Sequence, residues 1–354
     1  MLEIYGWSDG LQRDFAIHAA AGLTPGRVIL QQRGHYGLAT EAGELRARIS
    51  GRLAREAPPG GYPAAGDWVA VSPDDAGGAT IHHVLPRRTA FVRKASGPGG
   101  GMQVVAANVD VAFLTASLNA DLNPRRLERY LAAAWQSGAA PVVLLTKADL
   151  CGDIAAAVAG VEAFAAGAPV HALSSLTGEG LDALAGYLTP GRTAVMVGSS
   201  GAGKSTLANA LLGTRHMATR AIREADARGR HTTSHRELIL LPGGGLLLDT
   251  PGMRELGLWD SDEGLAATFE DIETLAADCR FADCGHSNEP GCAVRAALEA
   301  GELDAARWSS FQKLRRELAF LESKEDPSLR AAKRRQWVQI TKAQRAQYKQ
   351  RGRE

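Results

Sequence analysis

A glycine-rich turn between an apolar run and a helix-like run constrains this chain more than any other feature. Residues 193–197 suit a buried strand, and they precede Gly198-Ser199-Ser200-Gly201-Ala202-Gly203-Lys204-Ser205-Thr206 and the leucines of a helix. Glycines at the first and sixth positions, followed by Lys-Ser, form the phosphate-loop pattern. Glycines let backbone N–H groups approach an anion closely, and the helix start adds the positive end of its dipole. We therefore predict a strand–loop–helix unit that binds the phosphates of a nucleotide.

Every residue from Gly198 to Thr206 is a predicted nucleotide contact, and two have specific roles. Lys204 is expected to reach the β- and γ-phosphates, and the Ser205 hydroxyl to ligate Mg²⁺. An ordinary strand–helix turn with chance glycines is the alternative, and the flanking strand and helix disfavour it. The loop does not define which base the nucleotide carries.

Composition narrows the class of protein. A length of 354 residues allows two or three domains, and 45% hydrophobic residues can build real cores. The first 20 residues carry charges and no apolar run, and no window approaches 18 uninterrupted apolar residues. Three of the four cysteines lie within residues 279–292, which suggests metal rather than disulfides. We expect a monomeric cytoplasmic protein without a membrane partner.

The first part of the chain has the pattern of a small β-domain. Five strand-like runs are separated by Gly- and Pro-containing turns, at residues 27–32, 35–39, 44–49, 67–71 and 79–84. Short strands at this spacing predict a closed barrel of the oligonucleotide-binding type. The region is basic through Arg46, Arg48, Arg52, Arg55, Arg87, Arg88, Arg93 and Lys94. An RNA-facing surface and an ordinary solvated face both remain open for this region alone.

Beyond Gly97-Pro98-Gly99-Gly100-Gly101, interpreted as a domain boundary, strand and helix patterns alternate. Strands are predicted at residues 109–114, 141–145, 169–173, 193–197, 238–241 and 246–248, and helices at 124–137, 154–166 and 181–188. This alternation predicts a mostly parallel sheet with helices on both faces. In such sheets, ligands bind at the carboxyl ends of the strands.

Two short motifs at predicted strand ends indicate guanine as the base. Thr146-Lys147-Ala148-Asp149 resembles the Asn-Lys-x-Asp motif of GTPases, with threonine at its first position. The Asp149 carboxylate can accept the N1–H and N2–H₂ donors of guanine, whereas adenine would leave it unpaired. Lys147 is expected to pack along the base and sugar. Ser174 and Ser175 stand where GTPases place a Ser-Ala pair against guanine O6; a helix cap is the alternative role of Asp149.

The segment Asp249-Thr250-Pro251-Gly252 follows the last predicted strand of the sheet. Asp249 can hold the Mg²⁺ shell through water, and the Gly252 N–H can bond the γ-phosphate and so sense its presence. Common GTPases run from the phosphate loop through the switch threonine and Asp-x-x-Gly to the two guanine motifs, whereas here the guanine motifs come before the phosphate loop. The chain is therefore predicted to be a circularly permuted GTPase domain, in which Asp249 leads directly into the C-terminal region.

A polar stretch at residues 220–236 is expected to act as the switch loop. Thr232 and Thr233 both qualify to complete the Mg²⁺ shell, and the sequence does not decide between them. The residue after Gly252 is Met253, which cannot orient water as the glutamine of small GTPases does. His231 is the candidate for that catalytic role, with a solvated loop histidine as the alternative.

The C-terminal region combines a metal-binding pattern with a basic tail. Cys279, Cys284, His286 and Cys292 offer three thiolates and one imidazole, which suit one structural zinc ion; free buried thiols and a catalytic zinc are less favoured. Helices are predicted at residues 294–300 and 305–321. Residues 330–353 hold nine Lys/Arg with Trp337 and Tyr348 interleaved, a composition that favours RNA over a merely solvated tail.

Together these motifs resemble the family of small-ribosomal-subunit-dependent GTPases (RsgA, also called YjeQ) over nearly the whole chain. The resemblance implies hydrolysis of GTP to GDP with Mg²⁺, one zinc ion, and a late assembly role on the small ribosomal subunit and its rRNA. It also implies low intrinsic turnover that the subunit stimulates. Thr146 departs from the usual asparagine, which questions how firmly the guanine loop is braced.

The resemblance suggests a division of the chain into five parts. These are an N-terminal segment (1–25), an OB-type barrel (26–98), the permuted GTPase domain (99–262), a zinc-binding helical domain (263–329) and a basic tail (330–354). Two other classes of function stay open: a nucleotide hydrolase that does not bind RNA, and an RNA-binding scaffold whose nucleotide site is vestigial.

Overall fold

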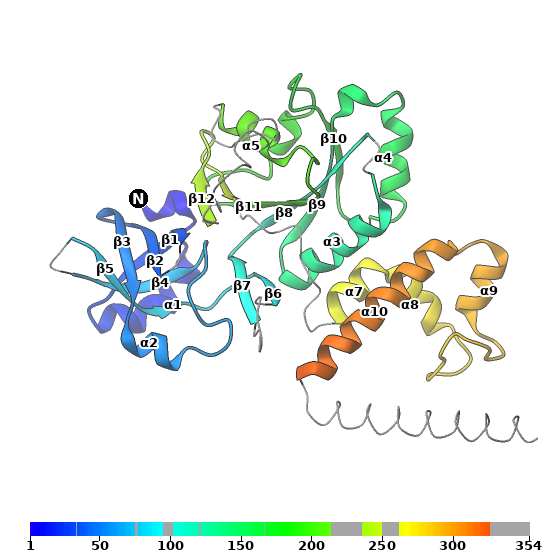
Figure 1. Ribbon diagram of the computed structural model, residues 1–354, viewed down its shortest axis with the longest axis horizontal. Coiled ribbons are helices and arrows are strands. Elements are labelled where there is room, and N and C mark those ends of the chain that lie inside the picture. Colours follow the sequence, from blue (N-terminus) through cyan, green and yellow to red (C-terminus); the bar gives the residue numbers. More distant parts are fainter. Residues whose placement is uncertain are drawn as a thin grey trace, which may run out of the picture.

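The computed structural model describes residues 1–32, 34–74, 77–94, 102–119, 122–165, 167–213, 236–249 and 262–325. Figure 1 shows a small barrel at one end, an α/β sheet in the middle and a group of helices at the other end. The basic tail predicted at 330–354 lies outside the described residues. No helix among the described residues is long and apolar enough to span a membrane.

The barrel predicted from the sequence is confirmed. Its five strands pair in the order β1-β2-β3-β5-β4, and β1 also pairs with β4 and closes the ring. Alternate residues such as Val28, Leu38, Val69 and Ile81 fill its interior and are fully buried. The strands are β1 (Thr24–Gln32), β2 (His35–Thr40), β3 (Gly43–Ile49), β4 (Trp68–Pro73) and β5 (Ala79–Val84).

Helices cover the outside of this barrel. The N-terminal residues form η1 (Leu2–Tyr5) and α1 (Asp9–Ala20), and a short helix α2 (Gly51–Glu56) follows β3. The Ser8 hydroxyl caps α1 by accepting from the Leu11 N–H. Leu11 and Phe15 are buried on this helix in one cluster with Trp68. The N-terminal segment is thus an ordered part of the barrel wall.

The central sheet has the predicted parallel α/β architecture. Its strands lie in the order β10-β9-β8-β11-β13-β12, and all neighbours are parallel except β12, which is antiparallel to β13. They are β8 (Val111–Ser117), β9 (Ala140–Thr146), β10 (Val170–Leu173), β11 (Thr193–Gly198), β12 (Arg236–Leu240) and β13 (Leu246–Asp249). Helices α3 (Pro124–Ser137) and α4 (Ile154–Glu162) pack on one face, and α5 (Lys204–Leu212) packs on the other.

One predicted helix of this sheet is wrong. Residues 181–188 hold only the 3₁₀ turn η3 (Asp182–Leu184), and the turns around it are closed largely by bonds between residues three apart. Leu184 and Leu188 are both buried, at a spacing that suggests a helix. Successive single turns bury the same two side chains, so the spacing alone does not distinguish the two structures.

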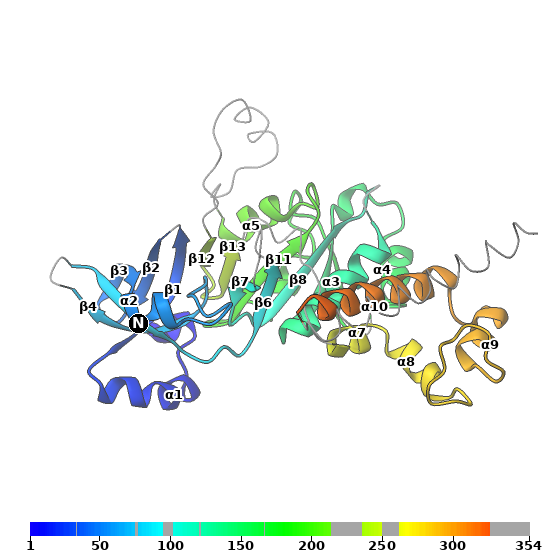
Figure 2. The ribbon, with the colours of Figure 1, turned by 60° about the horizontal axis from the view of Figure 1, so that its bottom comes forward.

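The chain passes from the barrel to the central sheet through a separate two-stranded sheet, and one strand pairing joins the barrel to the central sheet directly. β6 (Ala90–Lys94) and β7 (Met102–Ala107) pair antiparallel from either side of the predicted boundary after residue 98, and the five-part division remains a prediction. The joining pair is β1 with β12, through Leu30↔Glu237 and Gln31↔Arg236. The barrel and the central sheet therefore form one continuous eleven-stranded sheet, and β12 lies at their junction in Figure 2.

A fully buried arginine reinforces this junction. The Arg27 guanidinium donates to the carbonyls of Gly66, Tyr5 and Asn108 and to the Thr193 hydroxyl, and it lies 5.1 Å from the Trp68 ring centre. Burial lowers its pKa to about 10, so the side chain keeps its charge at neutral pH. One side chain thereby joins the N-terminal segment, the barrel and the first residue of β11.

We expect Arg27→Leu to lower the free energy of unfolding by at least about 3 kcal/mol, because it leaves several buried acceptors without a donor. Urea denaturation followed by tryptophan fluorescence measures the change. Arg52→Leu is the matched control, since Arg52 is exposed and forms an ion pair with Glu56 of its own helix. A loss below about 1 kcal/mol for Arg27→Leu would argue against this role.

The C-terminal helices dock on α3. They are α7 (Asp262–Thr268), α8 (Glu270–Ala277), α9 (Ala293–Ala300) and α10 (Ala305–Glu325). Gly264 lets α7 approach closely, because a Cβ at this position would lie 2.3 Å from the Ala132 carbonyl oxygen. Arg307 donates to Glu128 on α3, at 3.0 Å, and to both carboxylate oxygens of Asp271. Packing and ion pairs together attach this helical module to the central sheet.

Candidate nucleotide-binding site and metal centre

The predicted phosphate loop has the expected local structure. β11 ends at Gly198, and α5 begins at Lys204 directly after Gly203, which has a left-handed φ of 84°. The Lys204 ammonium crosses the loop and donates to the carbonyls of Gly198 and Ser199, at 2.6 Å each. Ser205 is half-buried in the first turn of α5. The loop therefore brings a lysine, a hydroxyl and a helix N-terminus together at the carboxyl edge of the sheet.

Close packing explains why the first position of the loop is a glycine. A Cβ at Gly198 would lie 2.3 Å from the Thr115 Oγ1 atom and 2.4 Å from the Thr115 carbonyl oxygen. Thr115 in turn donates from its hydroxyl to the Val197 carbonyl, at 2.8 Å. β8 thus presses directly against the end of β11, and only glycine fits there.

The guanine motifs lie together at the ends of β9 and β10. The Ser174 hydroxyl, which is buried, donates to Asp149 Oδ1 at 2.5 Å and accepts from the N–H groups of Leu176 and Thr177. The Asp149 carboxylate is exposed and held in one orientation by this bond. The buried Ser175 hydroxyl has no hydrogen-bond partner among the described residues. A guanine edge in front of Asp149 would offer its N1–H and N2–H₂ donors to the carboxylate.

Thr146 links the guanine motif to the phosphate loop. Its hydroxyl donates to the Ala202 carbonyl at 2.8 Å and lies 3.3 Å from the Ala116 carbonyl, and the residue is buried. Gly203 packs beside the same side chain, since a Cβ there would lie 3.4 Å from Thr146 Oγ1. The threonine therefore braces the loop in spite of its departure from asparagine. The sequence showed the residue but not this contact, which joins positions far apart in the chain.

We expect Thr146→Val to weaken GDP binding about fivefold to tenfold, because it leaves the buried Ala202 carbonyl unpaired next to the loop. Titration of a fluorescent guanine nucleotide measures this affinity. Thr146→Ser keeps the hydroxyl and is expected to stay within about twofold of wild type. Equal losses for valine and serine would assign the effect to packing rather than to the hydrogen bond.

The predicted magnesium and switch residues are only partly within the described residues. Asp249 is the last residue of β13, where its partner in the strand register is Glu237 on β12. β13 runs parallel to β11 beside the loop. Asp249 and Ser205 are therefore carried at the carboxyl edge of two neighbouring strands. His231, Thr232, Thr233, Gly252 and Met253 lie outside the described residues, and their predicted roles remain predictions.

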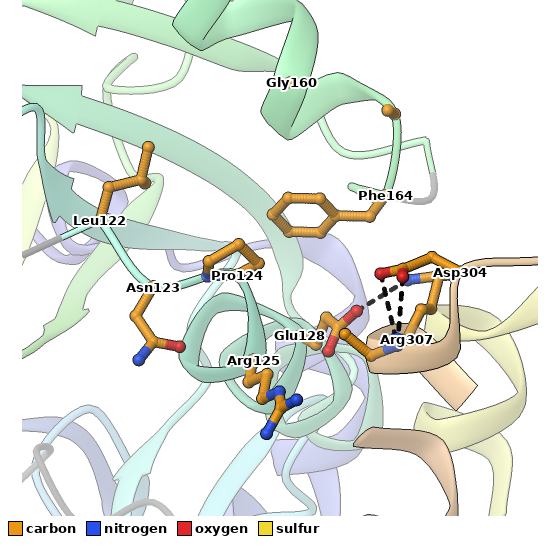
Figure 3. Close-up of a pocket in the computed structure, with 11 residues that line it drawn as sticks. Leu122, Asn123, Pro124, Arg125, Glu128, Gly160, Phe164, Asp304 and Arg307 are labelled. Carbon is orange, nitrogen blue, oxygen red and sulfur yellow. Dashed lines mark hydrogen bonds and ion pairs between the residues drawn. The ribbon is translucent and has the colours of Figure 1, made fainter. Parts of the chain in front are cut away.

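A separate pocket lies at the junction of α3, α4 and α10. Figure 3 shows Glu128 and Arg307 directed toward one another on one side of this cavity, which has a volume of about 640 Å³. Leu122, Pro124 and Phe164 supply apolar walls. None of the predicted nucleotide residues lines it. The pocket belongs to the attachment of the helical module and not to the nucleotide site.

The four predicted metal ligands come together, and they form the only such cluster found among the described residues. The ligand atoms of Cys279, Cys284, His286 and Cys292 all lie within 4.8 Å of one another. His286 Nδ1 lies 3.6 Å from the Cys279 sulfur and 3.5 Å from the Cys292 sulfur, and those sulfurs are 3.9 Å apart. A tetrahedral zinc ion would require about 3.5 Å for N···S and about 3.8 Å for S···S. The donor set and spacing therefore fit zinc.

Neighbouring groups fix the shape of this cluster. The His286 ring meets the Trp308 ring edge-on, with centroids 5.7 Å apart, and His286 has a positive φ of 55°. The Glu289 carboxylate accepts from the N–H groups of Gly285, Ser287 and Asn288 and holds the intervening loop. These contacts orient the imidazole before any metal binds.

The pKa of the Cys284 thiol lies above its usual value. The backbone N–H of His286 acts to lower the pKa of this thiol, but desolvation and the neighbouring Cys292 and Cys279 sulfurs raise it to about 11. Metal binding must therefore displace at least one thiol proton at neutral pH, as expected for a thiolate site.

The fold and the site together define a class. A phosphate loop that follows the guanine-type motifs, on a sheet continuous with a five-stranded barrel, is the arrangement of a circularly permuted P-loop GTPase. A sequence model of the RsgA GTPase family matches residues 84–259. The chain belongs to the RsgA GTPase family.

Individual relatives agree with this assignment over nearly the full length. A protein of Opitutus terrae, named Small ribosomal subunit biogenesis GTPase RsgA, is 48% identical, with 99% of each chain covered. A protein of the same name from Streptomyces avermitilis is 50% identical, covering 94% of this chain and 90% of that one. The crystal structure of YjeQ from Thermotoga maritima matches with a TM-score of 0.63 and 26% identity, covering 84% of this chain and 98% of that one. The fold predicted from the sequence is thereby confirmed.

Proposed function

We propose that this GTPase acts as a late assembly factor of the small ribosomal subunit, binds the RNA of the subunit and turns over GTP faster when bound to it. The observation that carries the nucleotide half of this proposal is the Thr146–Ala202 bond. This bond fixes the guanine motif and the phosphate loop as one unit. The subunit half is supported by the names of full-length relatives. Such a role places the protein in the cytoplasm.

The residues of the site fit GTP, GDP and Mg²⁺. Lys204 would hold the phosphates, Asp149 the guanine edge, and Ser205 and Asp249 the metal ion. Mg²⁺, when bound, neutralises charge that develops on the phosphate oxygens. The backbone of the phosphate loop supplies N–H donors that cost no reorganisation during the reaction. The site thus stabilises phosphate charge, and the water-positioning group is still proposed to be His231.

The barrel and the C-terminal region supply the proposed contacts with the ribosomal subunit. Exposed arginines of the barrel and the basic composition of residues 330–353 would attract the phosphates of rRNA. One zinc ion in the Cys₃His cluster would hold the helical module in shape. Because β1 and β12 share a ladder, a partner bound to the barrel would act directly beside the GTPase site.

Hydrolysis of GTP by the full chain, with and without purified small ribosomal subunits, tests the proposal. We expect strong stimulation that declines as salt is raised, because contacts with phosphates release counterions. Ordinary turnover that subunits do not change would favour a nucleotide hydrolase without an RNA partner. Subunit binding without measurable hydrolysis would favour a scaffold with a vestigial nucleotide site.

A further inference from the structure

Two arginines are buried at the junction between barrel and central sheet, and their surroundings differ. Arg27 uses four of its five N–H donors on four acceptors. Arg236, the first residue of β12, is only 9% exposed, and in its one hydrogen bond among the described residues Nη1 donates to Gln31 Oε1 at 2.9 Å. No nitrogen of its guanidinium is both fully enclosed and without a hydrogen-bond partner. The nitrogens that make no hydrogen bond therefore reach solvent. Arg236 is therefore a largely buried cation with donors to spare.

Arg93 on β6 borders the same core as Arg236. Phe91 on β6 and Leu238 on β12 belong to the same buried cluster. Arg93 follows Phe91 by two residues, and Arg236 precedes Leu238 by two, so each arginine lies on the strand face that enters the cluster. Figures 1 and 2 both place the β6–β7 hairpin beside the end of the barrel that meets β12. Each arginine therefore borders this extended core, and the two are near enough for the charge of Arg93 to act on Arg236.

The charges of this pair are not balanced by acids. Neither Arg93 nor Arg236 makes an ion pair within the part of the chain that the structure describes, and Arg93 donates to the neutral Gln103 side chain at 3.1 Å. Burial and then the charge of Arg93 lower the pKa of Arg236 to about 10, so both remain charged at neutral pH. Two neighbouring cations that lose solvation without gaining an acidic partner favour the binding of an anion.

We propose that Arg93 and Arg236 form a binding site for one phosphate group of an RNA backbone at the junction of barrel and GTPase sheet. The guanidinium fork pairs with phosphate oxygens through two parallel N–H bonds, and a phosphate has enough oxygens to serve both arginines. This inference rests on the proposed function, since it names where the RNA of the subunit meets the protein.

The location of this site connects the barrel with the nucleotide site. Glu237, the residue after Arg236, is the strand partner of Asp249 at the end of β13. The anion would therefore bind beside the strand that carries the predicted magnesium ligand. Gln31, which holds Arg236, lies on β1 of the barrel. A phosphate bound here would hold β1 and β12 in place. Binding of RNA at the barrel would thereby affect the nucleotide site.

Binding of small ribosomal subunits at several salt concentrations tests the site. We expect Arg236→Gln and Arg93→Gln each to weaken binding about tenfold, the loss of a charge-assisted contact. The slope of log affinity against log salt should fall by about 0.7 to 0.9 for either variant, and no further for the double variant, because one phosphate is shared. Arg236→Lys keeps the charge but not the fork, so it should retain the slope and lose part of the affinity.

Controls separate the possible outcomes. Arg125→Gln, on an exposed residue of α3, removes the same charge elsewhere and should leave affinity within about twofold. GDP affinity and thermal unfolding of each variant verify that the junction still folds.

If wild type does not bind subunits, the proposed function fails; if wild type binds and both variants bind equally well with an unchanged slope, this inference alone fails. Stabilisation of wild type but not Arg236→Gln by inorganic phosphate, with unchanged subunit binding, would assign the site to free phosphate and overturn the RNA proposal.

Discussion

The Lys204→Ala protein is expected to show kcat/KM for GTP at least about 100-fold below wild type, both alone and with ribosomal subunits. The Lys204 ammonium already lies across the loop, 2.6 Å from the Gly198 and Ser199 carbonyl oxygens, where a bound nucleotide would place its phosphates. Removing it takes away the positive charge that meets the charge developing on the transferred phosphate. Phosphate release measures turnover, and a fluorescent nucleotide measures affinity.

Lys313→Ala provides the matched control for this result. Lys313 is exposed on α10, so the variant loses the same charge away from the loop and should keep its turnover within about twofold. A Lys204→Ala protein that hydrolyses GTP at nearly the wild-type rate would remove the phosphate loop from the mechanism. It would also revive the hypothesis of a scaffold with a vestigial nucleotide site.

Elements with a strong local pattern could be predicted from the sequence. The five barrel strands were each placed within a few residues of their ends, because alternating apolar residues bounded by glycine and proline turns carry that information locally. The helix at 124–137 matches α3 fully, since Asn123 caps its start and Gly138 ends it. The Cys₃His cluster was predictable for the same reason: its four ligands lie within fourteen consecutive residues.

Contacts that join distant parts of the chain could not be predicted. The β1–β12 ladder pairs Gln31 with Arg236, and no local pattern sets that register. The buried role of Arg27 was also missed, because an arginine on a barrel strand is normally solvated. The brace from Thr146 to Ala202 depends on the packing of β9 against the phosphate loop, which only the folded sheet supplies. These tertiary contacts hold the site together, whereas the motifs only identify its parts.

We expect Cys292→Ser to lose the bound zinc, from about one ion per chain to almost none, and to unfold the helical module. Cys292 is buried, and its sulfur both belongs to the cluster and caps α9 by accepting from the Arg295 N–H. Serine keeps the cap but supplies no thiolate, so the effect isolates the metal. Structural zinc contributes on the order of 10 kcal/mol to the folding of small modules. Metal analysis of the purified protein and limited proteolysis after residue 262 measure both effects.

Cys151→Ser is the control, because Cys151 is the one cysteine outside the cluster. It should retain the zinc and the resistance to proteolysis. The module packs on α3 through a cluster of its own, which includes Phe269, Phe311 and Leu314, whereas the phosphate-loop helix packs in a different one. GDP affinity of Cys292→Ser should therefore stay within about threefold of wild type while subunit-stimulated turnover falls. Full zinc content in this variant would contradict the assigned ligand set, and an intact module without zinc would make the metal dispensable for the fold.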